Sequence, residues 1–205
     1  MNLPTKLTVL RIVLLPVLLA FAYVSFPWHD LVAAAVFVIA AATDFLDGYL
    51  ARKLDQVTSL GKFLDPIADK MLVVCALFIV VGRASFAYGV NVYVAVCAVM
   101  IMSRELMIDA FRLVAASKGI VIAADKLGKA KTLVTDIALP LLLLNVHRYV
   151  SLAGLILLGA ATLLTIWSGI NYVVRNKRVL KDDKGAEAPS EGAYPDGNGN
   201  TDAAE

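Results

Sequence analysis

Four aspartates lie at regular spacing in one short stretch of the chain. The pattern reads D-x2-D-G-x2-A-R, then eight residues, then G-x3-D-x3-D. Residues three, four and seven positions apart share one face of a helix, so Asp44 and Asp47 line one stripe while Asp65 and Asp69 line another. A turn near residues 54–59 would let the two helices run antiparallel. We therefore expect the two acidic stripes to face each other.

Carboxylates that converge in this way need positive charge close by, because like charges repel and their desolvation is costly. Carboxylate oxygens are hard ligands that suit Mg²⁺ or Mn²⁺ and not zinc or copper. Gly48 and Gly61 lie on the same stripes and allow a ligand or a neighbouring helix to approach closely. A set of solvated acids would explain one or two of these positions, but not the shared register. The spacing therefore predicts a divalent-metal site.

A second group of charged residues follows and is basic. Its predicted phosphate-binding members are Arg104, Arg112, Lys129 and Lys131. Guanidinium and ammonium groups suit a phosphate-bearing ligand. A general excess of basic residues at the cytoplasmic ends of membrane spans is the alternative explanation. Arg104 fits that alternative poorly, because it lies inside an apolar segment.

The elements that must position these groups are strongly apolar. Of the 205 residues, 60% are hydrophobic and 18% are charged, whereas soluble domains average about 45–50% and about 25%. The apolar segments cover residues 12–27, 31–51, 60–82, 87–112, 127–146 and 150–174. A bilayer span needs about 20 such residues. We expect an all-α integral membrane protein with six transmembrane helices, preceded by a short interfacial helix in MNLPTKLTVLR.

The distribution of basic residues predicts how these spans are oriented. Arg83 and Arg148 fall in the turns expected on one side, and the other 17 of the 19 Lys and Arg residues fall on the opposite side. The positive-inside rule makes that opposite side cytoplasmic. Both termini and all the charged interruptions are then cytoplasmic, in a multi-pass protein of a bacterial-type inner membrane.

The C-terminal region differs in composition from the rest of the chain. Residues 179–205 are rich in Gly, Ala and acidic side chains and lack the apolar content to fold. We expect a membrane domain over residues 1–178 and a disordered acidic cytoplasmic tail over residues 179–205.

The aspartate stretch resembles the signature of the CDP-alcohol phosphotransferases, over about residues 1–178. All eight signature positions agree: Asp44, Asp47, Gly48, Ala51, Arg52, Gly61, Asp65 and Asp69. These enzymes move a phosphatidyl or similar group from a CDP-linked donor to an alcohol and release CMP. The resemblance implies six transmembrane helices, a preceding interfacial helix, a cytoplasmic-side active site and a homodimer in the membrane lipid.

The resemblance also implies roles for individual residues. The four aspartates would bind two divalent ions, Mg²⁺ or Mn²⁺, and Asp69 would take the proton from the acceptor hydroxyl. The positions expected near the CDP-linked donor are Gly48, Ala51, Arg52 and Gly61. Thr8, in the interfacial segment, is a further candidate for the nucleotide.

The basic stretch resembles one subfamily, the phosphatidylglycerophosphate synthases. It shares R-E in the fourth segment, an Arg eight residues later, and then G-x-V-I-A-A and G-K-x-K-T. The implied substrates are CDP-diacylglycerol and glycerol 3-phosphate. Asp109 departs from that subfamily, where a small or uncharged residue is expected. It could pair with Arg112 at i, i+3 or reshape the acceptor site.

Two other functions compete with this interpretation. The same chemistry could serve another acceptor, namely inositol phosphate, serine or phosphatidylglycerol. The carboxylates could instead form the pathway of a divalent-cation transporter, since intramembrane acids often mark ion paths. Transport would place acids near the midplane and would not need the basic group. We expect no nucleic-acid partner.

Overall fold

The computed structural model describes residues 3–54, 59–83, 88–120 and 126–177. At some positions within the helices only the backbone is described. The described part is helical, with α1 Leu3–Tyr23, α2 His29–Leu54, α3 Ser59–Gly82, α4 Tyr88–Ser117, α5 Lys126–Leu144 and α6 Arg148–Arg175. No strand occurs in these ranges. The expectation of an all-α membrane protein is confirmed.

The expected interfacial helix is not a separate element. The segment that we assigned to it is the first part of α1, which runs without a break from Leu3 to Tyr23. Pro4 falls in the first turn, where a missing N–H group costs nothing, and no residue that ends a helix follows before Pro16. Pro16 itself lies inside the helix, which continues past it.

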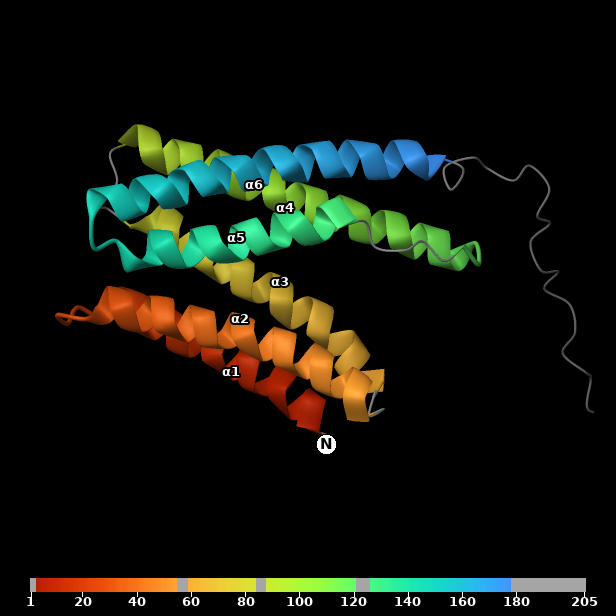
Figure 1. Cartoon of the computed structure of the whole chain (residues 1–205), viewed down its shortest axis with the longest axis horizontal. Coiled ribbons are helices and arrows are strands. Elements are labelled where there is room, and N and C mark those ends of the chain that lie inside the picture. The colour runs from red at the N-terminus through yellow and green to blue at the C-terminus, as the bar shows by residue number, and fades with distance from the viewer. Residues whose placement is uncertain (1–2, 55–58, 84–87, 121–125, 178–205) are drawn as a thin grey trace, which may run out of the picture.

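Successive helices run in opposite directions, so α1 begins and α6 finishes at the same end of the molecule (Figure 1). We call this the charged end, because the acidic and basic groups predicted from the sequence lie toward it. α1 and α6 are long and apolar enough to cross a membrane by length and composition. Among the helices that the structure describes, the other four carry more charge, mostly near the charged end.

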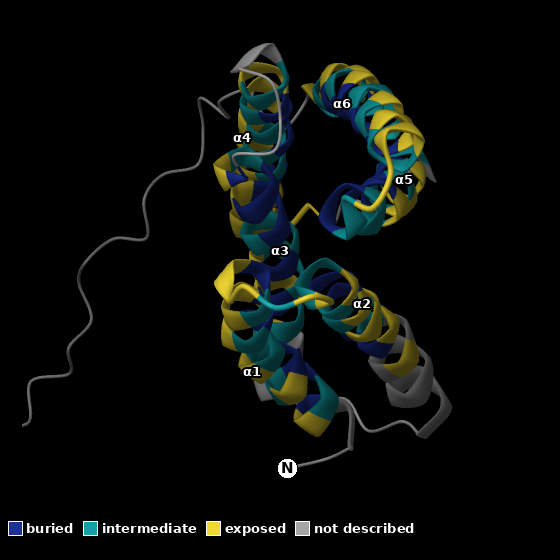
Figure 2. Cartoon of the chain, turned by 90° about the vertical axis from the view of Figure 1, so that its left-hand side faces the viewer, coloured by how far each residue is buried: buried dark blue, intermediate teal, exposed yellow. Residues whose placement is uncertain are grey.

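α3 lies at the centre of the bundle. It packs against α1, α2, α4 and α5, while α6 packs against α4 and α5. Figure 2 shows α1 and α2 on one side of α3, with α4, α5 and α6 on the other. The main core joins fully buried residues of several helices, including Leu18, Phe37, Leu77, Leu142 and Leu158. This central position puts the acidic face of α3 within reach of both halves.

Large apolar side chains cover much of the outer surface. Phe78, Leu113, Leu163 and Trp167 are each about 70% exposed, at 70%, 73%, 70% and 68%. Soluble monomers rarely expose contiguous apolar surface on this scale. The outer surface is therefore suited to contact lipid.

At the end of the bundle opposite the charged end, a buried arginine connects three helices. The Arg83 Nη1 atom lies 2.9 Å from Asp30 Oδ1 at the start of α2, and it donates to the Leu143 carbonyl oxygen of α5 at 2.6 Å. Arg83 therefore ties the end of α3 to two neighbouring helices, and its charge is used inside the protein.

Candidate active site

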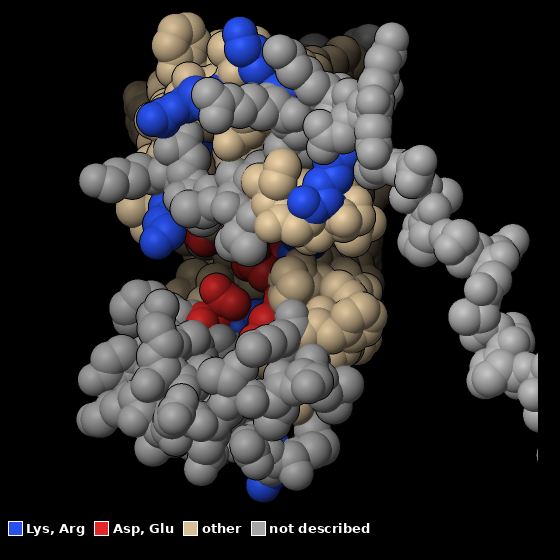
Figure 3. Space-filling view, turned by 90° about the vertical axis from the view of Figure 1, so that its right-hand side faces the viewer, with Lys and Arg blue, Asp and Glu red and all other residues tan. Residues whose placement is uncertain are grey.

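The predicted acidic stripes meet at the charged end. Asp44 projects from α2, and Asp65 and Asp69 from α3. The Asp44 and Asp69 carboxylates are close enough to repel each other. Figure 3 shows acidic side chains gathered in a hollow on this face. α2 and α3 run in opposite directions, and this arrangement brings Asp44 toward Asp69, as the spacing predicted.

Four of the predicted positions lie outside what the structure describes at side-chain level. They are Asp47, Gly48, Ala51 and Arg52, at the end of α2. Gly61 is described and is buried one turn before Asp65. The metal and donor roles assigned to these residues remain predictions.

α1 supplies two contacts to the acidic group. Arg11 is fully buried, and its Nη1 atom lies 2.8 Å from Asp44 Oδ1. Its Nε atom donates to the Ala40 carbonyl oxygen at 3.3 Å. Thr8, one turn earlier on the same face and also buried, donates its hydroxyl to Asp65 Oδ1. α1 therefore holds one carboxylate from each acidic stripe.

The donor atoms of this group suit a divalent ion by their chemistry. Arg11 contacts Oδ1 of Asp44, and Thr8 contacts Oδ1 of Asp65. Each carboxylate keeps further oxygen lone pairs that could hold a cation. Among the side chains described, no three of the His, Cys, Asp or Glu type are grouped closely enough to form a metal site. Asp47, the fourth predicted ligand, is not among those side chains. The oxygen donors fit Mg²⁺ or Mn²⁺.

The basic residues line a neighbouring polar cavity. Arg104 Nη2 donates to Ser168 Oγ at 3.1 Å, and its Nη1 atom lies 3.1 Å from Glu105 Oε1. Arg112 Nε donates to the Tyr172 hydroxyl at 3.1 Å, and its guanidinium lies 5.5 Å from the centroid of the Tyr172 ring. α6 therefore fixes both arginines of α4 in place.

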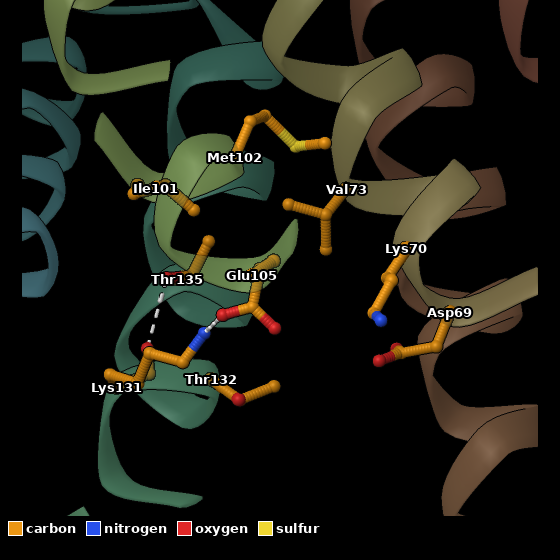
Figure 4. A pocket seen from close by; sticks show the side chains of 9 residues that line it. All are labelled: Asp69, Lys70, Val73, Ile101, Met102, Glu105, Lys131, Thr132 and Thr135. Carbon is orange, nitrogen blue, oxygen red and sulfur yellow. Dashed lines mark hydrogen bonds and ion pairs between the residues drawn. The ribbon is translucent and has the colours of Figure 1, made fainter. Parts of the chain in front are cut away.

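A second, smaller cavity contains the predicted base. Figure 4 shows its lining, which combines Asp69 and Lys70 of α3 with residues of α4 and α5. Lys131 of α5 is buried and donates to Glu105 Oε1. Glu105, Lys131 and Thr132 line both cavities. The carboxylate cavity and the basic cavity therefore adjoin.

Each predicted phosphate-binding residue has a defined place in this arrangement. Arg104, Arg112, Lys129 and Lys131 all line the basic cavity. Arg112 and Lys129 are exposed, whereas Lys131 is buried against Glu105. The structure brings the four to one cavity, which adjoins that of Asp69, although they come from two helices.

Two acids have interactions that the sequence did not predict. Asp109 pairs with Lys70 of α3, so the suggested i, i+3 pair with Arg112 is wrong. Asp136 of α5, to which the sequence assigns no role, interacts electrostatically with both Asp69 and Asp44. Both interactions join different helices, which periodicity within one helix does not reveal.

Comparison with known proteins is consistent with this geometry. The model of the CDP-alcohol phosphatidyltransferase family matches residues 1–167. The chain is 38% identical over 183 residues to a CDP-diacylglycerol–glycerol-3-phosphate 3-phosphatidyltransferase of Salmonella choleraesuis, covering 88% of this chain and 98% of that protein. For the protein of the same name from Haemophilus influenzae the identity is 39%, covering 89% and 97%. For that of Escherichia coli K12 it is 36%, covering 88% and 98%.

Proposed function

The chain belongs to the CDP-alcohol phosphatidyltransferase family, and on this premise we propose that it transfers the phosphatidyl group of CDP-diacylglycerol to glycerol 3-phosphate. The products are phosphatidylglycerol phosphate and CMP, so the enzyme serves phospholipid biosynthesis. One observation carries the choice of acceptor. The cavity that contains Asp69 adjoins a cavity lined by four cations, and the two share Glu105, Lys131 and Thr132.

The basic cavity binds the phosphate of the acceptor. Arg104 and Arg112 present guanidinium groups that can each form paired hydrogen bonds to phosphate oxygens. Ser168 and Tyr172 already hold these two side chains, so little rotamer freedom is lost when the phosphate binds. Lys129 and Lys131 add positive charge from α5.

Asp69 takes the proton from the attacking hydroxyl of glycerol 3-phosphate. With the phosphate in the basic cavity, that hydroxyl reaches into the adjoining cavity that Asp69 lines. A general base needs hydrogen-bond reach to the proton that it removes. The deprotonated hydroxyl oxygen then forms a bond to the phosphorus next to the lipid, and CMP leaves.

Divalent metal dependence is general in this family. In this chain Asp44, Asp47, Asp65 and Asp69 would hold two ions, Mg²⁺ or Mn²⁺. When bound, such ions neutralise the diphosphate of the donor and stabilise charge on the reacting oxygens. We assign Thr8, Gly48, Ala51, Arg52 and Gly61 to the donor, with Thr8 acting beside Asp65, whose carboxylate it contacts.

We further propose where the enzyme acts. All six helices would span a bacterial inner membrane, with the charged end in the cytoplasm and the chain paired as a homodimer. The charged end collects the acids, the basic cavity and both ends of the described chain. The proposed acceptor, glycerol 3-phosphate, is a soluble phosphate ester that reaches the protein from the cytoplasm.

An acceptor screen tests this function. Purified protein in mixed micelles with CDP-diacylglycerol, Mg²⁺ and labelled glycerol 3-phosphate is expected to give a labelled lipid and an equal amount of CMP. Asp69→Asn is expected to abolish turnover, because the base is lost. Product with inositol phosphate, serine or phosphatidylglycerol, and none with glycerol 3-phosphate, would refute the acceptor. Metal flux in proteoliposomes without any lipid product would refute the reaction.

A further inference from the structure

Lys70 occupies an unusual position beside the predicted base. It follows Asp69 directly in α3, and both side chains line the same cavity. Figure 4 shows them projecting toward that cavity together. The other charged groups in its lining are Glu105 and Lys131, which bind each other. An ammonium group on a flexible stem therefore lies next to a carboxylate that must remain available.

Lys70 does not pair with Asp69 in the structure. Its ion-pair partner is Asp109, which projects from α4. The described charged groups that act most on Asp69 are Asp44, Arg11, Glu105 and Lys131. Asp109 thus engages the nearest cation in the sequence and directs it toward α4.

The direction of this contact matters because opposite charges that are incompletely solvated attract strongly. If Asp109 lost its charge, the acceptors closest to the Lys70 ammonium would be the carboxylates that line its own cavity. Glu105 is already bound by Lys131 and Arg104, so Asp69 is the carboxylate that remains. An ammonium bound to Asp69 would compete with a divalent ion and with the acceptor hydroxyl.

We propose that Asp109 is a positioning residue, which holds Lys70 against α4 and so keeps Asp69 open to metal and acceptor. This role rests on the proposed function of Asp69. This role also explains why an acid stands at position 109, where the phosphatidylglycerophosphate synthases are expected to have a small or uncharged residue. Asp109 prevents the Lys70 ammonium from binding to the Asp69 carboxylate, and it touches no substrate itself.

The test is a double-mutant cycle on the purified full chain, with Mn²⁺ binding followed by electron paramagnetic resonance. Asp109→Asn is expected to weaken Mn²⁺ binding about tenfold, because the freed ammonium is a direct competitor at close range. Lys70→Met alone is expected to bind Mn²⁺ as the parent does. The double variant should return to the parental affinity, because the competitor is gone. Asp109→Glu should also restore it.

A purely structural brace between α3 and α4 predicts a different pattern. Asp109→Asn, Lys70→Met and the double variant would then weaken Mn²⁺ binding equally, and that result would overturn the proposal. Unchanged Mn²⁺ binding in Asp109→Asn would overturn the proposal as well. So would a parent protein that binds no Mn²⁺. Mn²⁺ binding is measured without the acceptor. If the variants show the expected Mn²⁺-binding pattern but the parent makes no lipid product, that result would count against the proposed function alone.

Discussion

Arg11 is the residue through which α1 takes part in the acidic group. Its side chain is fully buried and lies 2.8 Å from Asp44, whose own side chain is 45% exposed. It also acts on Asp69, which repels Asp44. A buried cation between two carboxylates lowers the cost of holding them together when no divalent ion is bound. Arg11 is therefore expected to matter most to the metal-free protein.

Arg11→Met tests this expectation. Breaking a fully buried ion pair costs about 3–5 kcal/mol, and the exposure of Asp44 reduces the expected loss of unfolding free energy to about 2 kcal/mol. Thermal unfolding in detergent with EDTA should show a lower midpoint. Mg²⁺ should raise that midpoint more in the variant than in the parent, because the ion replaces the missing charge.

Arg175→Met is the matched control, since Arg175 is exposed at the end of α6. It should leave both midpoints unchanged. An Arg11→Met midpoint equal to that of the parent in EDTA would show that the buried pair does not stabilise the acidic group.

The difference between Asp69 and Arg11 shows what sequence reasoning could reach. The stripe containing Asp65 and Asp69 follows from helical periodicity, which acts within one element. Arg11 and Asp44 lie on different helices, and their contact depends on how α1 packs against α2. The only sequence signal was an arginine one turn after Thr8, in the segment assigned to the interfacial helix. That signal is equally typical of membrane anchoring.

At the scale of elements, the close packing of α5 and α6 positions half of the basic cavity. α5 carries Lys129 and Lys131, and α6 carries Tyr172. The two helices approach closely at Gly154. A Cβ atom there would lie 2.8 Å from Leu142 Cγ and 3.3 Å from the Ala138 carbonyl oxygen. Leu142 is fully buried, so its side chain has little room to move.

Gly154→Val is expected to destabilise the protein by about 1–3 kcal/mol through overpacking. The neighbouring substitution Ala153→Val adds similar bulk at an exposed position and should change stability little. Chemical unfolding of both variants in detergent micelles measures the difference. Equal stability of the two variants would mean that α5 and α6 separate at this point without cost.

Element boundaries were the weaker part of the sequence prediction. The apolar segments located all of the described helices, but α1 begins at Leu3 and α4 continues to Ser117. Hydropathy marks where a bilayer would contact a helix, whereas backbone hydrogen bonding continues until a residue or a turn stops it. The amphipathic last turns of α4 bury Ile108, Phe111 and Ala115 against Tyr172 of α6. That packing extends the helix beyond the apolar segment.

At the scale of the whole molecule, the orientation in the membrane remains a prediction from the distribution of basic residues. Of the two arginines at the end opposite the charged end, Arg83 is buried and paired with Asp30. Arg148 is exposed. The positive-inside rule counts Lys and Arg whatever acids pair with them, so both arginines still count and the imbalance remains the one predicted from the sequence.

This orientation can be tested with two serine-to-cysteine substitutions that add almost no volume. Ser25 is exposed between α1 and α2, and Ser117 is exposed at the end of α4, at the opposite end of the bundle. Cys75 and Cys97, which form no disulfide, are first replaced by Ala. A membrane-impermeant maleimide should label Ser25→Cys in intact cells, and Ser117→Cys only in inverted vesicles, because the charged end faces the cytoplasm. Labelling of Ser117→Cys in intact cells would place the charged end on the outer face, away from cytoplasmic glycerol 3-phosphate. That result would contradict both the orientation and the proposed acceptor.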